Sequence, residues 1–223
     1  MEISTFLAYL IILIFFCLEF LLHYRLVNII KPKMTIKQKS NVLSIKSSLS
    51  MFLIGLYFNY HYFTSKFNES HFFNILEEKN SLNFGKIIIL YFTAYLIMDI
   101  YIGHKEYNIY MKTISGNFHH AVYSIVNILS LYIGVYPLYL LHMLSELPTF
   151  LLNIGQFDEN LRDDYLFGGT FFMTRIVYHI ILTWLFRKHT LMLSLSLAAL
   201  GLHCYWFFNW SKKYLYKHKI NKN

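Results

Sequence analysis

The sequence predicts an all-α fold, a polytopic transmembrane helix bundle with about seven spans. Hydrophobic residues make up 56% of the 223 residues and charged residues only 14%, and the mean hydropathy is +0.41. This balance leaves too little polar surface for a water-soluble protein of this length. The apolar residues also gather into blocks close to the roughly 20 residues that a helix needs to cross about 30 Å of hydrocarbon.

Each apolar block is one expected span. Helices are favoured over a β-barrel because the blocks are continuously apolar and lack the alternation of barrel strands. Only Tyr136-Pro137 separates the fourth block from the fifth, so the two form either a tight helical hairpin or one long broken helix. The expected spans are Thr5 to Tyr24, Leu43 to Phe63, Lys86 to Ile102, His119 to Tyr136, Pro137 to Asn153, Leu166 to Phe186 and Leu191 to Trp210.

The first block is expected to stay in the protein as a membrane anchor. It begins after Glu2 without a basic segment, runs long for a signal peptide and lacks a cleavage site of small residues. Cys17 and Cys204 both fall inside expected spans, and two cysteines make neither a disulfide framework nor a metal site.

Lysine and arginine predict the orientation. They concentrate between the first two spans, from Arg25 to Lys46, and in the tail, from Lys212 to Lys222. Cytosolic loops carry an excess of these residues, so we expect both segments in the cytosol and the N-terminus outside. The glycosylation triplet Asn68-Glu69-Ser70 then lies on the luminal side. The net charge of +8 fits anionic headgroups, so the expected partners are membrane lipids, with no nucleic acid.

Polar side chains inside the expected spans mark a candidate cavity. His142, Glu146 and Asn153 of the fifth span share one helix face with Thr149. A matching stripe in the fourth span comprises His120, Tyr123, Asn127, Ser130 and Gly134. Arg175, with His179 one turn later, lies within the sixth span, and His203 lies in the seventh. The substrate-cavity residues are therefore expected to be His142, Glu146, Asn153, Arg175 and His203.

A buried arginine needs a partner, since it costs about 2.5 to 3.5 kcal/mol on insertion scales, and Glu146 is the obvious one by depth. A plainer interpretation stays open, in which Glu146 and Arg175 form a structural ion pair between helices. Asn127, Ser130, Thr149 and Thr174 would in that case be interhelical hydrogen-bonding groups, and the tyrosines and tryptophans would be interface anchors.

Asp99, His119 and His120 are the candidate catalytic residues. Asp99 is expected near the cytosolic end of the third span, and the histidine pair opens the fourth at similar depth. Neighbouring helix residues point about 100° apart, so one histidine could do chemistry while the other orients. A histidine with its ordinary pKa of about 6.5 can take and return a proton, and a carboxylate can fix its tautomer. This pattern suits activation of a hydroxyl or amine toward an acyl thioester.

Metal binding is the rival interpretation of these three residues. Two histidines and an aspartate could hold iron or zinc, but the spaced histidine boxes of a membrane di-iron enzyme are missing. No metal and no bound cofactor are therefore expected.

This ordered pattern resembles the TLC domain, a family that includes translocating-chain-associated membrane proteins and ceramide synthases. The resemblance covers residues 40–213, and its pieces match the family in order and spacing. Residues 1–39 are then a leading transmembrane helix with a basic cytosolic loop, and residues 214–223 are a basic cytosolic tail. The pieces are Tyr95 to Asp99 closing one span, His119-His120 opening the next, Glu146 to Asn153 reading E-L-P-T-F-L-L-N, Phe171 to Arg175, and His203 to Phe207.

The resemblance implies a six-helix TLC-like core around a central cavity, in the endoplasmic reticulum or a related endomembrane. In ceramide synthases the histidine pair belongs to the catalytic site, which transfers a fatty acyl group from coenzyme A to a sphingoid base amine. The chain departs from that pattern in having no aspartate between Ala121 and Phe157, where Glu146 is the only acid. It looks closer to the small TLC-domain proteins.

Lipid handling is the predicted function, with acyl transfer from acyl-CoA to a lipid amine or hydroxyl as its sharpest form. A non-catalytic factor in lipid binding, membrane homeostasis or cargo trafficking is the alternative, and the missing aspartates favour it. A proton-coupled transporter could use His142, Glu146, Arg175 and His203 as a relay, but paired broken helices in two similar halves are missing.

Overall fold

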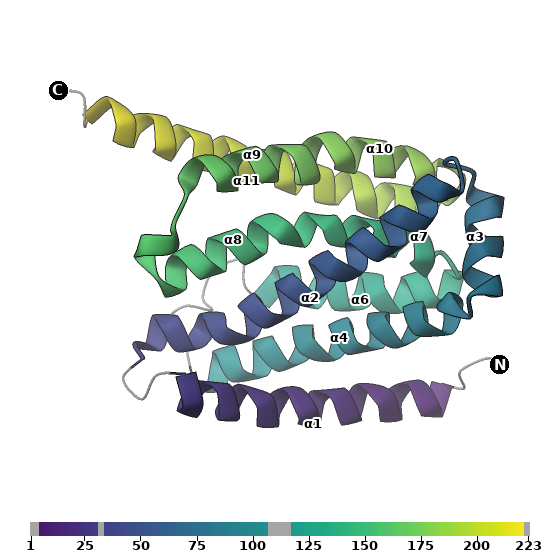
Figure 1. The fold of residues 1–223 in the computed structure, drawn as a ribbon, viewed down its shortest axis with the longest axis horizontal. Coiled ribbons are helices and arrows are strands. Elements are labelled where there is room, and N and C mark those ends of the chain that lie inside the picture. The colour runs from purple at the N-terminus through teal and green to yellow at the C-terminus, as the bar shows by residue number, and fades with distance from the viewer. Residues whose placement is uncertain (1–4, 31–33, 107–116, 221–223) are drawn as a thin grey trace.

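The computed structural model describes residues 5–30, 34–106 and 117–220, and within these ranges every regular element is helical. The predicted all-α class is therefore confirmed. The long helices run along a common axis, with α1 (Thr5–Ile30) on one side of the bundle and α11 (Thr190–Ile220) on the other (Figure 1). Parts of the predicted basic segments, residues 31–33 and 221–223, lie outside the described residues.

Five helical stretches of the described chain are long and apolar enough to cross a membrane. They correspond to the first, second, third, sixth and seventh predicted spans. Two of them are α2 (Ile36–Thr64) and α4 (Ser81–Glu106). Each of these five stretches is longer than the apolar block that predicted it. The five stretches are Tyr9–Ile29, Ile36–Thr64, Ser81–Glu106, Asp164–Lys188 and Thr190–Leu215.

The predicted fourth and fifth spans form a broken hairpin. Its first arm is α6 (Asn117–Ile133), of 17 residues. The turn that follows is built on Gly134, whose φ of +82° is open to glycine at no steric cost. The chain then runs back beside α6 (Figure 1). The hairpin alternative is thus the one found, and neither arm is long enough as a single helix to count as a span.

The returning arm is not one regular helix. It consists of α7 (Tyr136–Leu141), the 3₁₀ turn η1 (His142–Ser145) and α8 (Glu146–Phe157). The single helix predicted for Pro137 to Asn153 is therefore interrupted. The interruption fits against Gly55 of α2, since a Cβ there would lie 2.5 Å from the backbone nitrogen of Leu144. The missing side chain lets the two backbones approach.

The sixth predicted span is also divided. It begins with α9 (Asp164–Phe171), capped by the Asp163 carboxylate, and passes through the π-helical turn η3 (Phe172–Val177). It ends with α10 (Tyr178–Leu185) and the 3₁₀ turn η4 (Phe186–Lys188). A π-helical turn widens the helix and often marks a functional site.

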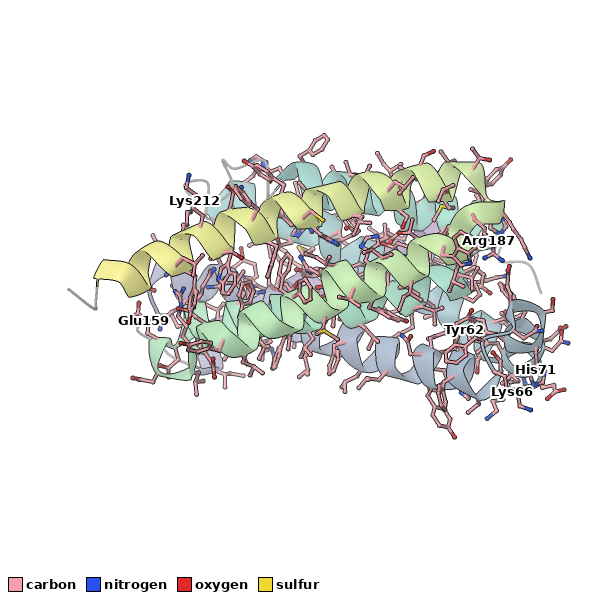
Figure 2. The ribbon with its side chains drawn as sticks, turned by 90° about the horizontal axis from the view of Figure 1, so that it is seen from above. Tyr62, Lys66, His71, Glu159, Arg187 and Lys212 are labelled. Carbon is pink, nitrogen blue, oxygen red and sulfur yellow. The ribbon has the colours of Figure 1, made fainter. Side chains whose placement is uncertain are left out.

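Two short elements lie outside the predicted spans. The amphipathic helix α3 (Glu69–Glu78) occupies the predicted luminal loop, and the Asn68 side chain caps it by accepting a hydrogen bond from the His71 backbone N–H at 3.0 Å. The 3₁₀ turn η2 (Glu159–Leu161) lies at the other end of the bundle. Figure 2 shows this separation, with Glu159 and Lys212 near one end and His71 and Arg187 near the other.

The core lies around α4. In the most apolar part of α4, 56% of the residues are buried. The corresponding share for α1 is 11%, so α1 presents most of its surface outward. In a bilayer this difference costs little, because hydrocarbon chains solvate leucine as well as a protein core does. The largest fully buried side chains include Met51, Phe58, Ile89, Leu96, Met98 and Leu138.

Candidate functional site

Two cavities lie inside the bundle and meet. We define the outer chamber as the larger, of about 470 Å³, and the inner chamber as the smaller, of about 310 Å³. Phe92, His119 and Glu146 line both. These three residues therefore mark the junction between the chambers.

The outer chamber has mainly apolar walls that carry several charged and polar side chains, and its mouth is charged. Arg162, Asp163, Asp164 and Lys213 line it. Glu159 lies three residues before Arg162, and Lys212 directly precedes Lys213. Figure 2 places those two neighbours at one end of the bundle, so the chamber opens at that end. By the predicted orientation this is the cytosolic end.

Arg175 connects the π-helical turn η3 to the returning arm. Its Nε donates to the backbone oxygen of Ser145 at 2.9 Å, and its Nη2 donates to Thr149 Oγ1 at 2.5 Å. Glu146 Oε1 lies 3.9 Å from Nη2, and the guanidinium carbon lies 5.2 Å from the centroid of the Phe171 ring. Glu146 is thus a partner of Arg175, as predicted, but the close hydrogen bonds come from Ser145 and Thr149.

Asp99 and His120 approach each other across α4 and α6. His120 Nδ1 lies 3.1 Å from Asp99 Oδ2, within ion-pair distance, although the alignment falls short of a hydrogen bond. Both side chains are largely buried, with 15% and 14% of their surface exposed. His120 lines the outer chamber, and Asp99 stands behind it.

His119 points to the junction between aromatic rings. Its ring centroid lies 4.5 Å from that of Tyr123 and 5.5 Å from that of Trp206. Its Nδ1 is buried without a hydrogen-bond partner among the described residues. The two adjacent histidines therefore have different surroundings, one beside a carboxylate and one between aromatic rings.

The inner chamber has one polar wall and one apolar wall. His142, His179, Ser196 and His203 form the polar wall. The apolar wall comes mainly from α6 and α11 and includes Val122, Val126, Leu195 and Leu202. The chamber reaches the outside of the bundle at Phe118 and Ala198, which line it and are exposed, with the half-buried Ala199 beside them. Because α11 is one of the stretches able to cross a membrane, this opening would face the hydrocarbon region of a bilayer.

The structure brings every predicted site residue except Asp99 to the walls of these two chambers. The predicted shared helix face for the returning arm needs correction, because η1 interrupts the helix at His142, yet the side chains still reach the chambers. The outer chamber receives His119, His120, Glu146, Asn153 and Arg175, the inner chamber receives His119, His142, Glu146 and His203, and Asp99 contacts His120.

Of the predicted interhelical hydrogen-bonding groups, two act in that way. Asn127 Nδ2 donates to Thr93 Oγ1 of α4 at 3.1 Å, and Thr149 binds Arg175. Ser130 and Thr174 instead donate to backbone oxygens of their own helical segments, at 2.7 and 2.8 Å.

Ser196 and a second buried ion pair escaped the sequence interpretation. Ser196 precedes His203 by seven residues, a spacing that places both on one face of α11 and could have revealed it. Glu19 of α1 pairs with Lys46 of α2, and Lys46 Nζ lies 5.3 Å from the centroid of the Tyr91 ring. A lone acidic residue inside the first apolar block was the available signal.

The five apolar helical stretches define the class of the molecule as an α-helical, multi-pass integral membrane protein. Comparison of the chain with protein-family models, with curated proteins and with solved structures finds no match in any of the three. The resemblance to the TLC domain therefore rests on the residue pattern alone.

Proposed function

We propose that this protein handles membrane lipids by binding an amphiphile across the two chambers. The observation that carries the proposal is the junction, at His119 and Glu146, of a chamber that bears charged side chains such as Arg175 with a more apolar one. A lipid needs both environments, because its headgroup requires hydrogen-bonding partners and its chain requires apolar walls. The headgroup would lie in the outer chamber near Arg175, and the chain would enter the inner chamber.

Acyl transfer is the sharpest form of this proposal. His120 would take a proton from a lipid amine or hydroxyl, and the freed nitrogen or oxygen would attack the carbonyl carbon of an acyl-CoA thioester. The C–S bond breaks, and the imidazolium returns the proton to the leaving thiolate. Asp99, beside Nδ1, would hold the reactive tautomer and stabilise the imidazolium. His119, at the junction, would position the reacting carbonyl.

A non-catalytic lipid-binding factor, acting in membrane homeostasis or cargo trafficking, is the second candidate. The incomplete alignment of His120 with Asp99 favours it, as does the lack of an aspartate between Ala121 and Phe157. In this form the chambers hold a lipid without turnover.

The TLC-like core belongs to the same proposal. Counting the hairpin of α6 and α7–α8 as two membrane-crossing arms would give seven spans, six of them in the core after α1. The resemblance also supports the proposal that the protein resides in the endoplasmic reticulum or a related endomembrane, with membrane lipids and acyl-CoA as its partners.

The test combines lipid identification with turnover. Gently purified protein is examined for bound lipid by mass spectrometry, then incubated with radiolabelled palmitoyl-CoA and either a sphingoid amine or a diacylglycerol as acceptor. Catalysis predicts that His120→Asn lowers the rate by about 100-fold or more and that Asp99→Asn also lowers it. His71→Asn is the matched control, since His71 is exposed on α3, away from both chambers.

The outcomes separate the candidates. Equal product from the wild type and both variants removes the catalytic role. Bound lipid without turnover selects the non-catalytic factor. If the purified protein carries no bound lipid and shows no turnover, the lipid-handling proposal as a whole is overturned.

A further inference from the structure

The polar wall of the inner chamber is more than a hydrocarbon chain requires. Three imidazoles, from His142, His179 and His203, line a chamber whose other walls are mostly apolar. Polar groups at membrane depth are costly and cluster where they serve a ligand, an ion path or a helix contact. An acyl chain alone would leave any free imidazole nitrogen without a hydrogen-bond partner.

The direction of the hydrogen bonds along this wall follows from one carbonyl. His203 Nδ1 lies 3.1 Å from the backbone oxygen of Arg175, which can only accept. His203 therefore carries its proton on Nδ1. His179 Nδ1, 3.0 Å away, must then be an acceptor of that same proton. An uncharged His179 in turn carries its proton on Nε2.

The rest of the chain is consistent with that assignment. His179 Nε2 donates to Ser196 Oγ at 3.1 Å, and Ser196 donates to Thr183 Oγ1 at 2.8 Å. Thr183 closes the series by donating to the backbone oxygen of His179 at 2.8 Å. Each hydroxyl and each nitrogen of His179 is thus used within the protein.

His203 Nε2 is left over as a hydrogen-bond acceptor. With Nδ1 protonated, a neutral imidazole has its lone pair on Nε2, and the structure gives this atom no hydrogen-bond partner among the described residues. The neighbouring His142 also has no hydrogen-bond partner among the described residues, and its ring packs against Phe186, His179 and Tyr139, with centroids 5.4, 4.7 and 6.2 Å away.

A role in holding helices together explains only half of this arrangement. The Nδ1 side of His203, together with His179, Ser196 and Thr183, ties α10 and η3 to α11. It leaves Nε2 of His203 and both nitrogens of His142 unexplained. A metal ion does not explain them either, because within the described ranges no group of three His, Cys, Asp or Glu side chains has a ligand arrangement.

We propose that the inner chamber recognises an apolar molecule carrying a hydroxyl group, which donates its hydrogen bond to His203 Nε2. The inference rests on the proposed function and specifies the ligand class of the inner chamber as a hydrophobic alcohol. The opening at Phe118, Ala198 and Ala199 gives such a molecule a path from the bilayer, where it is dissolved.

The experiment measures competition in lipid nanodiscs. Radiolabelled hexadecanol is displaced by unlabelled hexadecanol, by hexadecyl methyl ether, which accepts but cannot donate, and by hexadecane, which does neither. We expect hexadecanol to compete about five-fold better than the other two, the equivalent of one net hydrogen bond of about 1 kcal/mol.

Two substitutions at His203 separate recognition from helix contact. In His203→Asn the amide nitrogen replaces Nδ1 and keeps the bond to Arg175, but no acceptor replaces Nε2. In His203→Gln the amide replaces Nε2 and the Nδ1 contact is lost. We expect His203→Asn to keep wild-type thermal stability and lose the preference for the alcohol, and His203→Gln to lose stability and keep the preference.

Each result bears on a different claim. If none of the three probes binds, the inner chamber does not take up long-chain molecules, and the part of the proposed function that places a lipid chain there fails together with this inference. If all three bind equally to the wild type, or if His203→Asn retains the preference for hexadecanol, lipid binding stands and hydroxyl recognition by His203 is overturned.

Discussion

Two buried ion pairs in this molecule each compensate charged side chains inside the helix bundle, but their surroundings differ. Glu19 and Lys46 join α1 to α2, and the ammonium group adds a contact with the Tyr91 ring of α4. Arg175 and Glu146 join η3 to the start of α8, with further bonds to Ser145 and Thr149. Only the second pair lines a chamber.

The comparison shows that a charge inside a membrane helix is not by itself a functional site. Glu19 is 2% exposed and packed among side chains, so its role is to attach α1 to the bundle. The Arg175 pair differs in two respects. It lies beside open space, and the backbone around it departs from α-helix in both η1 and η3. Irregular backbone at membrane depth is tolerated where it is enclosed by protein or lines a cavity.

Arg175→Met is the largest expected perturbation. Loss of the guanidinium leaves Glu146 unpaired and removes the bonds to Ser145 and Thr149, so we expect unfolding free energy to fall by about 3 to 5 kcal/mol. Chemical denaturation in mixed detergent micelles measures the change. Lipid binding to the chambers should be lost at temperatures where the variant is still folded.

Lys46→Met is the matched comparison, because it leaves Glu19 unpaired at the other ion pair. It should also lower stability, yet the folded fraction should bind lipid as the wild type does. If Lys46→Met abolished binding and Arg175→Met spared it, the assignment of one pair to attachment and the other to the chambers would be reversed.

Much of this division could be predicted from sequence, because burial cost depends on residue type and position. Apolar blocks located five of the long helical stretches, and helical spacing gathered Glu146, Asn153 and the histidines to one region. The partner of Arg175 followed from depth. Prediction from apolar blocks and helical spacing was therefore correct where the chain forms regular α-helix.

The prediction was incomplete where tertiary packing determines the backbone conformation. The 3₁₀ turn at His142 depends on the close approach of Gly55, which lies far away in sequence. The π-helical turn at Arg175 carries no proline or glycine to announce it. The short helix α3 was missed because its ten residues are too polar on one face to stand out as a span.

Gly55→Ala tests the contact between α2 and η1, and we expect it to have the second largest effect on stability. A Cβ would lie 2.5 Å from the Leu144 nitrogen and 2.7 Å from the Met143 carbonyl carbon, both backbone atoms that cannot rotate away. Overpacking of this kind costs about 1 to 3 kcal/mol. We expect that loss in denaturation experiments, together with weaker lipid binding as η1 is displaced.

Gly201→Ala is its control on α11, where nothing lies within 4 Å of the added Cβ. There the better helix propensity of alanine should raise stability by up to about 1 kcal/mol. A similar loss in both variants would mean that glycine acts through helix propensity and not through the contact with η1.

Ala198→Trp has the smallest expected effect on stability and tests the chamber side of the comparison directly. Ala198 is exposed and also lines the inner chamber, so a tryptophan can lie over the opening without displacing the core. Stability should change by no more than about 0.5 kcal/mol. Affinity for hexadecanol in nanodiscs should fall about ten-fold, the equivalent of about 1.4 kcal/mol of obstruction.

Gly201→Trp places the same side chain on the same helix where nothing surrounds it and no chamber is lined. It should leave affinity unchanged. Because the two variants have the same added ring and the same exposure to lipid, a ten-fold difference between them can come only from the opening. Equal loss in both would instead attribute the effect to the bilayer around α11, and the opening at Ala198 would have no part in ligand access.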